Sequence, residues 1–115
     1  MSERFVILHH TGITPPHFDL MLEGPDHLWT WACELNPMEL DEGTHSPARP
    51  QLDHRKHYLH HEGPVSGGRG AVKRVAEGTY RLLGRDEGLW RVSLHVSHTD
   101  HPITLHVGQS AVKRG

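Results

Sequence analysis

Short apolar or alternating segments, separated by glycine- and proline-rich turns, are the feature that most constrains how this chain folds. The 115 residues include 12 glycines and 8 prolines, and they contain no long amphipathic helix pattern. Short segments rich in β-branched and aromatic residues are typical of strands. They occur at residues 4–10, 17–22, 28–33, 71–75, 78–83, 90–96 and 103–107. The pattern predicts a mainly β fold, an antiparallel barrel or sandwich with little helix.

The segments between these strands predict turns and short helices. Residues 36–50 are rich in proline, glycine and acidic residues, so we expect a loop with a short helical turn near 36–40. Residues 55–61 fit either a strand or a short helix. The glycines of 67–70 predict a tight turn, and Glu77-Gly78 predicts a turn between two strands.

Composition indicates one folded domain that spans residues 1–115. Apolar residues make up 35% of the chain, the mean hydropathy is −0.58, and no apolar run approaches the about 20 residues of a membrane span. The N-terminus lacks the apolar stretch of a signal peptide. Cys33 is the only cysteine, which excludes an internal disulfide and fits a buried thiol in the reducing cytoplasm. We expect a cytoplasmic protein whose ends, residues 1–3 and 109–115, are frayed.

Charge is unevenly distributed along the chain. The formal net charge is only −2, yet residues 1–48 carry one basic and eight acidic residues, whereas residues 49–115 carry eleven basic and six acidic ones. This asymmetry predicts a cationic, phosphate-binding surface built from the second half of the chain, unless folding mixes the charges in space.

Histidine is the compositional outlier, with 13 residues, and three ligand-type residues stand out near the N-terminus. His17 and Asp19 alternate on a predicted strand, so their side chains point to the same face. His10 ends the preceding predicted strand, and pairing of the two strands brings it to the same place. Two imidazoles and one carboxylate leave open positions for water and substrate, as catalytic metal sites do. His10, His17 and Asp19 are therefore candidate metal ligands.

An ordered set of six motifs runs through residues 4–83. They are RFVILHH at 4–10, PHFDLMLE at 16–23, LWTW at 28–31, LDHRKHY at 52–58, EGP at 62–64 and GTY at 78–80. In order and spacing, this set resembles the 3′-phosphoesterase domain of bacterial DNA ligase D. The chain looks like a stand-alone, divergent member of that family, since it carries neither the ligase nor the polymerase domain.

The resemblance implies a compact antiparallel β-barrel and a metal-dependent enzyme, usually a manganese one, with Zn²⁺, Co²⁺ and Fe²⁺ as alternatives. Such an enzyme removes a terminal 3′ ribonucleoside and then the 3′-phosphate during non-homologous end joining. Its substrates are DNA or RNA-terminated DNA 3′ ends, and a separate DNA ligase or polymerase is the expected partner. By motif position, His10, His17 and Asp19 match the metal ligands, and His54 and Tyr58 match catalytic residues.

Two cations of the family are missing from this sequence. Met21 stands where the family has an arginine, two residues after the metal aspartate, and the lysine expected after the third strand's tryptophan falls in a region that contains Glu34. Arginine pairs with phosphate oxygens through a bidentate fork. We therefore expect either that Arg49, Arg55 or Arg69 supplies the phosphate contacts, or that the activity is weaker or shifted.

Two other functions stay open at this point. The missing cations also fit a non-catalytic nucleic-acid-binding or scaffolding domain with the same fold. Two histidines and a carboxylate also suit iron(II), as in a cupin-like metalloenzyme.

Two further groups of residues have plain structural interpretations. The tryptophans are expected in the core rather than stacked on nucleobases: Trp29, Trp31 and Trp90. Three neighbouring histidines are expected to be exposed polar residues rather than a second metal cluster: His57, His60 and His61.

Overall fold

The computed structural model describes residues 3–115, so the predicted fraying of residues 1 and 2 lies outside the described residues. Within that range the chain forms nine strands and two short 3₁₀ helices. In chain order they are β1 (Arg4–Thr11), β2 (His17–Glu23), β3 (Leu28–Cys33), η1 (Pro37–Glu39), β4 (His45–Pro50), η2 (Lys56–Leu59), β5 (Gly63–Pro64), β6 (Ala71–Asp86), β7 (Leu89–Val96), β8 (Ile103–Val107) and β9 (Ala111–Arg114).

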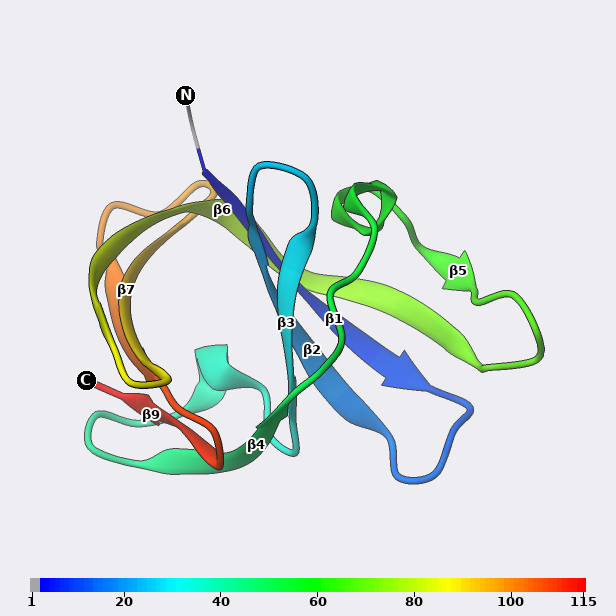
Figure 1. Ribbon diagram of the computed structural model, residues 1–115, viewed down its shortest axis with the longest axis horizontal. Helices are drawn as coiled ribbons and strands as arrows, with labels where there is room; N and C mark the ends of the chain where they lie inside the picture. Colours follow the sequence, from blue (N-terminus) through cyan, green and yellow to red (C-terminus); the bar gives the residue numbers. More distant parts are fainter. Residues whose placement is uncertain (1–2) are drawn as a thin grey trace.

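Two antiparallel meanders pair along both of their edges and close the sheet into a ring (Figure 1). The first meander is β1 to β4 and the second is β6 to β9. β4 pairs with β9 on one side, and β1 pairs with β6 on the other, both antiparallel. The predicted mainly β fold with little helix is confirmed.

β6 is one continuous strand of 16 residues, so the predicted turn at Glu77-Gly78 is wrong. Gly78 pairs with Phe5 of β1 and with Val96 of β7, and the strand passes from one neighbour to the other at this residue. A Cβ atom at Gly78 would collide with the carbonyl of His95. Glycine is needed here because another backbone approaches closely, which has the same sequence signal as a turn.

Two segments that were predicted to be irregular are strands. β4 forms despite Pro47 and Pro50, and it joins β3 to β9. Prolines lower strand propensity because they lack the N–H donor, which explains why the sequence pattern missed β4. The predicted fraying of residues 109–115 is wrong for residues 111–114, because β9 is held between β4 and β8 and its Val112 is fully buried.

The two 3₁₀ helices lie where helical turns were expected. The side chain of Asn36 caps η1 by accepting a hydrogen bond from Met38 N at 3.0 Å. The segment 55–61 contains η2, which resolves its helix-or-strand ambiguity in favour of a helix. Within residues 3–115 the structure has no helix that is long and apolar enough to cross a membrane.

The ring interior is filled by side chains that face inward at alternate positions along the strands. On β7, Trp90, Val92 and Leu94 are buried. Trp31 packs edge-on against Trp90 with 5.2 Å between ring centroids, and Trp29 is partly buried against the same cluster. The predicted core role of the tryptophans and the predicted burial of Cys33 are confirmed.

A second, smaller core lies on the outer face of β1 and β2. It consists of Val6, Leu8, Met21, Leu28, Leu59, Val65 and Val72. The segment between β4 and β6, which carries η2 and β5, covers this face from outside the ring (Figure 1). We call this cluster the outer core. It matters for function because His10, His17 and Asp19 alternate onto the same outer face.

Candidate metal centre

Strand pairing brings the three predicted metal ligands together. His10 of β1 lies directly opposite His17 of β2, and Asp19 follows two residues later on the same face of β2. Each residue offers one ligand atom, and these atoms lie within 4.8 Å of one another. Within residues 3–115, no other group of three histidine, cysteine or carboxylate side chains comes this close.

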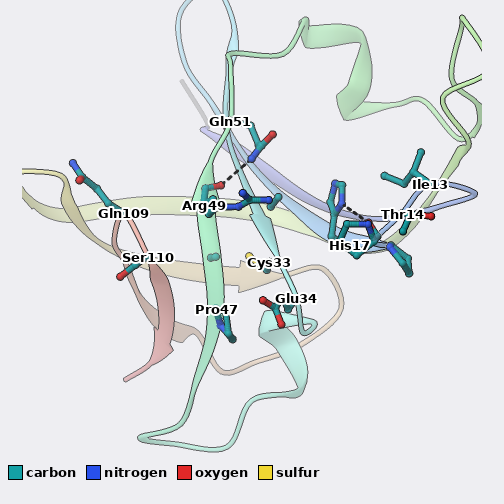
Figure 2. Close-up of a pocket in the computed structure, with 14 residues that line it drawn as sticks. Ile13, Thr14, His17, Cys33, Glu34, Pro47, Arg49, Gln51, Gln109 and Ser110 are labelled. Atoms are coloured by element: carbon teal, nitrogen blue, oxygen red, sulfur yellow. Dashed lines mark hydrogen bonds between the residues drawn. The ribbon is translucent and has the colours of Figure 1, made fainter.

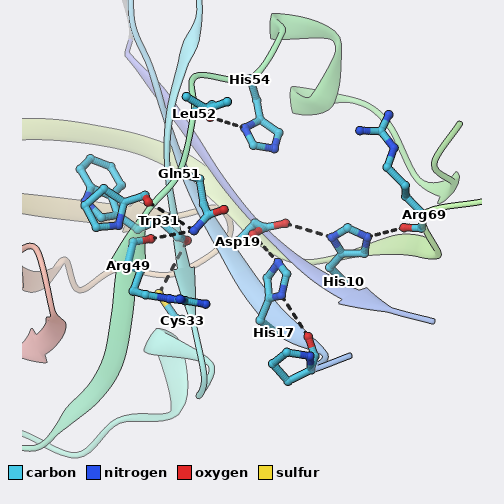
Figure 3. A network of polar contacts seen from close by, with 12 residues as sticks. His10, His17, Asp19, Trp31, Cys33, Arg49, Gln51, Leu52, His54 and Arg69 are labelled. Carbon is cyan, nitrogen blue, oxygen red and sulfur yellow. Dashed lines mark hydrogen bonds and ion pairs between the residues drawn. The ribbon is translucent and has the colours of Figure 1, made fainter. Parts of the chain in front are cut away.

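The carboxylate of Asp19 sits between the two imidazoles (Figure 3). Its Oδ1 is 2.9 Å from His17 Nε2, and its Oδ2 is 3.5 Å from His10 Nδ1. Asp19 is only 3% exposed. Burial raises the pKa of this carboxyl above its ordinary value, and the nearby His17, His10 and His54 oppose that rise. The ionised form of a buried carboxyl group is stabilised when a positive charge lies next to it.

The outer nitrogens of the two imidazoles are held by backbone carbonyls. His10 Nε2 lies 2.7 Å from the carbonyl of Arg69, and His17 Nδ1 lies 3.3 Å from that of Pro15. A carbonyl only accepts hydrogen bonds, so in each neutral ring this nitrogen carries the proton. The other nitrogen of each ring then presents a lone pair toward Asp19. Three acceptors that converge in this way fit a bound cation, and the carbonyl contacts are the outer partners that metal-binding histidines usually have.

The predicted catalytic pair lies beside this centre. His54, Tyr58, His10 and Asp19 together line a small cleft of about 70 Å³. His54 Nδ1 donates to the carbonyl of Leu52 at 2.8 Å, which leaves Nε2 of the neutral ring as an acceptor. The ring of Tyr58 contacts His54 edge-on, with 5.6 Å between centroids.

The three predicted phosphate-binding arginines border clefts that residues of the centre or its neighbours also line. Arg49 is on β4 and borders a larger cleft that His17 also lines. Arg55 and Arg69 border a shallow cleft together with His54 and Tyr58. Within residues 3–115, none of the three arginines forms an ion pair. They are therefore cations that border these clefts without a carboxylate partner.

Arg69 has a second role that the sequence did not reveal. Its guanidinium donates to the carbonyl of Ser66 at 2.8 Å, while its own carbonyl holds His10. The next residue, Gly70, has a φ of +76°, and a Cβ atom there would collide with the carbonyl of Thr11. The predicted tight turn at 67–70 is thus also the element that orients a candidate metal ligand, His10. The glycines of this segment were its only sequence signal.

The two residues that replace cations expected from the resemblance take different positions. Met21 is 1% exposed and belongs to the outer core, where it forms the wall of the small cleft next to Asp19. Glu34 is exposed and borders the larger cleft near His17. Neither residue offers a cation to a phosphate group at the centre.

The charges partly mix and partly separate on folding. Arg74 pairs with Glu62 and Glu77. On the outer face of four neighbouring strands, β7, β8, β9 and β4, however, there is a row of cationic and imidazole side chains. Cα pairing places these residues side by side: Arg91, His106, Lys113 and His45. We call these four residues the cationic row.

The remaining histidine cluster stays outside the centre. His57 and His60 are exposed, as predicted, and His61 is half-buried and donates from Nε2 to the carbonyl of Pro64. The ring of His57 packs against Tyr58 at 4.1 Å between centroids. These histidines therefore line the outside of η2.

No protein-family model matches this chain, and no curated protein matches it.

Proposed function

We propose that this protein is a metal-dependent phosphoesterase that acts on nucleic-acid 3′ ends. The observation that carries the proposal is the convergence of three acceptor groups, on His10, His17 and Asp19, next to the imidazole of His54. Mn²⁺ is the proposed cation, with Zn²⁺, Co²⁺ and Fe²⁺ as alternatives that the same ligand set accepts.

The donor set fits a divalent cation, and His10 Nδ1, His17 Nε2 and an Asp19 oxygen are the atoms that would hold it. A bound cation supplies Lewis-acid stabilisation of negative charge on a phosphoryl oxygen. The protein's own side chains supply proton transfer and position the phosphate group. His54 Nε2 accepts a proton in the neutral ring and donates one when the ring is protonated, so it serves as the general base or acid.

The arginines position the phosphate group. Arg49 approaches from the His17 side, and Arg55 and Arg69 approach from the His54 side. Guanidinium groups donate paired hydrogen bonds to phosphate oxygens, so these arginines serve in place of the two cations that the family has near Met21 and Glu34. Tyr58 orients the His54 ring through their edge-on contact.

The proposed substrates are DNA or RNA-terminated DNA 3′ ends in the cytoplasm. The proposed products are ends with a free 3′ hydroxyl, which a separate ligase or polymerase uses in end joining. The cationic row supports a nucleic-acid ligand, because phosphate backbones attract clustered positive charge.

A primer that ends in a 3′-phosphate or in one ribonucleotide tests the proposal. With Mn²⁺, the wild-type protein should convert both ends to a 3′ hydroxyl. His10→Ala and His54→Ala should each lose this conversion, and His101→Ala, at an exposed turn residue, should retain it. Absence of conversion by the wild-type protein, or full activity of both site variants, would contradict the proposal.

A non-catalytic nucleic-acid-binding domain is the second candidate, and the cationic row favours it. This function predicts primer–template affinity that falls steeply with salt, without turnover. Substituting both Arg91 and Lys113 by glutamine should weaken such binding and reduce its salt dependence. A cupin-like metalloenzyme is the third candidate, and metal analysis of the purified protein distinguishes it. Stoichiometric iron without phosphoesterase activity would indicate this function.

A further inference from the structure

A cleft of about 600 Å³ opens on the His17 side of the metal centre (Figure 2). The loop between β1 and β2 forms one wall, and the facing ends of β3 and β4 form the other. The turn between β8 and β9 closes one end with Gln109 and Ser110. Its volume lies within the about 300–1,000 Å³ typical of pockets that hold small organic ligands.

The exposed surface of this cleft is mainly apolar, with several polar side chains among its lining residues. Ile13, Pro15 and Pro16 line one side, and Pro47 and Ala48 line the other. Apolar walls with a few polar groups are the usual composition of a site for a ring-containing organic molecule.

The cleft is continuous with the metal centre. His17 belongs to both, because its ring is a candidate ligand and also lines the cleft. Ala32 lies opposite Asp19 on β2 and opposite Arg49 on β4, so the cleft begins one strand away from the buried carboxylate. A phosphate group at the centre would therefore direct its ester substituent along β3 into the cleft.

Charge in the cleft disfavours a second phosphate. Arg49 is its one cationic side chain, and Glu34 is an exposed carboxylate that borders the same space. A group that fills this volume beside both charges should be neutral. The amides of Gln51 and Gln109 and the hydroxyl of Ser110 then offer hydrogen bonds to a polar ring edge.

We propose that this cleft binds the nucleoside that is attached to the scissile phosphate, with the base between the apolar walls. This inference rests on the proposed function, since it assigns one part of the substrate of the same site. It makes the protein selective for phosphate esters of nucleosides over those of bare sugars.

Two oligonucleotides that differ only in the last base test this selectivity. One carries its 3′-phosphate on thymidine, and the other carries it on an abasic tetrahydrofuran residue. Without the base, the burial of its ring between the apolar walls is lost, at about 25 cal/mol per Å² of apolar surface, so kcat/KM should be roughly tenfold or more higher for the thymidine end. Equal kcat/KM values would overturn the inference and leave the proposed function intact.

A binding measurement keeps the inference testable without catalysis. In calorimetric titrations, thymidine 3′-monophosphate should bind at least about tenfold more tightly than inorganic phosphate, because its base is buried between the apolar walls. Ser110→Leu, which narrows the cleft, should reduce this advantage, whereas Ser97→Leu in the turn after β7 should not. Equal affinities for the two ligands would overturn the inference. Tight nucleotide binding without turnover would instead overturn only the proposed function.

Glu34 provides a test of the charge argument. Glu34→Lys should increase the affinity for thymidine 3′,5′-bisphosphate relative to the 3′-monophosphate. Glu42→Lys adds the same charge at an exposed residue of another turn and should leave that ratio unchanged. An unchanged ratio in Glu34→Lys would show that Glu34 does not set the charge preference of the cleft, which contradicts the charge argument.

Discussion

The ring interior and the outer core share strands β1 and β2 but differ in what encloses them. The interior is closed by strands on all sides, so each inward side chain meets other strand residues. The outer core is covered by a segment with little regular structure, which carries η2 and the loop before β6. His10 and Asp19 of the proposed centre line a small cleft together with residues of this cover. The comparison indicates that the ring supplies stability, whereas the cover completes the site.

Truncation of one leucine in each core should separate these roles. Leu94→Ala in the ring interior should lower the free energy of unfolding by about 3–5 kcal/mol, since Leu94 is fully buried between strands. Leu59→Ala in the outer core should cost about 2 kcal/mol, because the cover can relax around the cavity. Urea denaturation measures both values. A larger loss for Leu59→Ala would reverse the proposed division.

The same pair should behave oppositely in function. Leu59 is adjacent to Tyr58, so Leu59→Ala should reduce Mn²⁺-dependent turnover in the folded protein. Leu94→Ala should leave turnover of the folded fraction near that of the wild type. Activity at a temperature well below both unfolding transitions checks this prediction.

Gly70 tests how the cover orients the metal ligands. Gly70→Ala should destabilise the protein by at least about 1–2 kcal/mol, because φ is +76° and the new Cβ would collide with Thr11. It should also weaken Mn²⁺ binding by about tenfold, because the Arg69 carbonyl that holds His10 would move.

Gly43 is the matched control for this change. It has a φ of +81° and open space at its Cβ position, so Gly43→Ala should carry the backbone penalty alone. Equal Mn²⁺ affinities in the two alanine variants would show that the loop does not orient His10.

Tyr80 should contribute to stability without affecting the site. Its hydroxyl donates to the carbonyl of Glu23 at 2.7 Å, so Tyr80→Phe should cost about 1 kcal/mol. Burial raises the pKa of Tyr80, so the unfolded chain ionises first as pH rises. Wild-type stability should therefore fall above about pH 10, the ordinary tyrosine pKa, and Tyr80→Phe should lack this part of the fall. Denaturation at pH 8 and pH 11 measures the difference.

Treatment with a thiol reagent should have the smallest effect among these tests, because Cys33 is buried. Burial raises the pKa of its thiol to about 12, and the side chain is fully buried. A thiol reagent at pH 8 should leave the native protein unmodified and react quickly once the protein is unfolded. Rapid labelling of the native protein would show that the ring interior opens.

Much of the fold followed from local patterns. On β7, alternation of apolar and polar residues predicted one buried face, because only the ring interior covers that strand. On β1 and β2, unbroken apolar runs such as Phe5 to Leu8 reflect burial on both faces. Alternation also predicted that His17 and Asp19 share a face, since this depends only on strand geometry.

The features that the sequence did not predict depend on contacts between segments that are distant in sequence. The carbonyl of Arg69 reaches His10 across 59 positions in sequence, and side-chain patterns carry no information about a backbone acceptor. The prolines of β4 lowered its strand propensity, so this strand was not predicted. Gly78 was interpreted as a turn residue, although it lies where two strands approach closely. The burial of Met21 likewise depends on the cover, which has no periodic pattern of its own.

The most direct test of the account is a Mn²⁺ titration followed by electron paramagnetic resonance. We predict one tightly bound Mn²⁺ per chain, with nitrogen couplings from two imidazoles. Asp19→Asn and His17→Ala should each lose binding by more than about 100-fold, since even changes in residues behind the ligands cost 10–100-fold. Asp26→Asn, at an exposed turn residue, should bind as the wild type does. Wild-type affinity in Asp19→Asn, or bound Mn²⁺ without nitrogen couplings, would contradict the assignment of this metal centre.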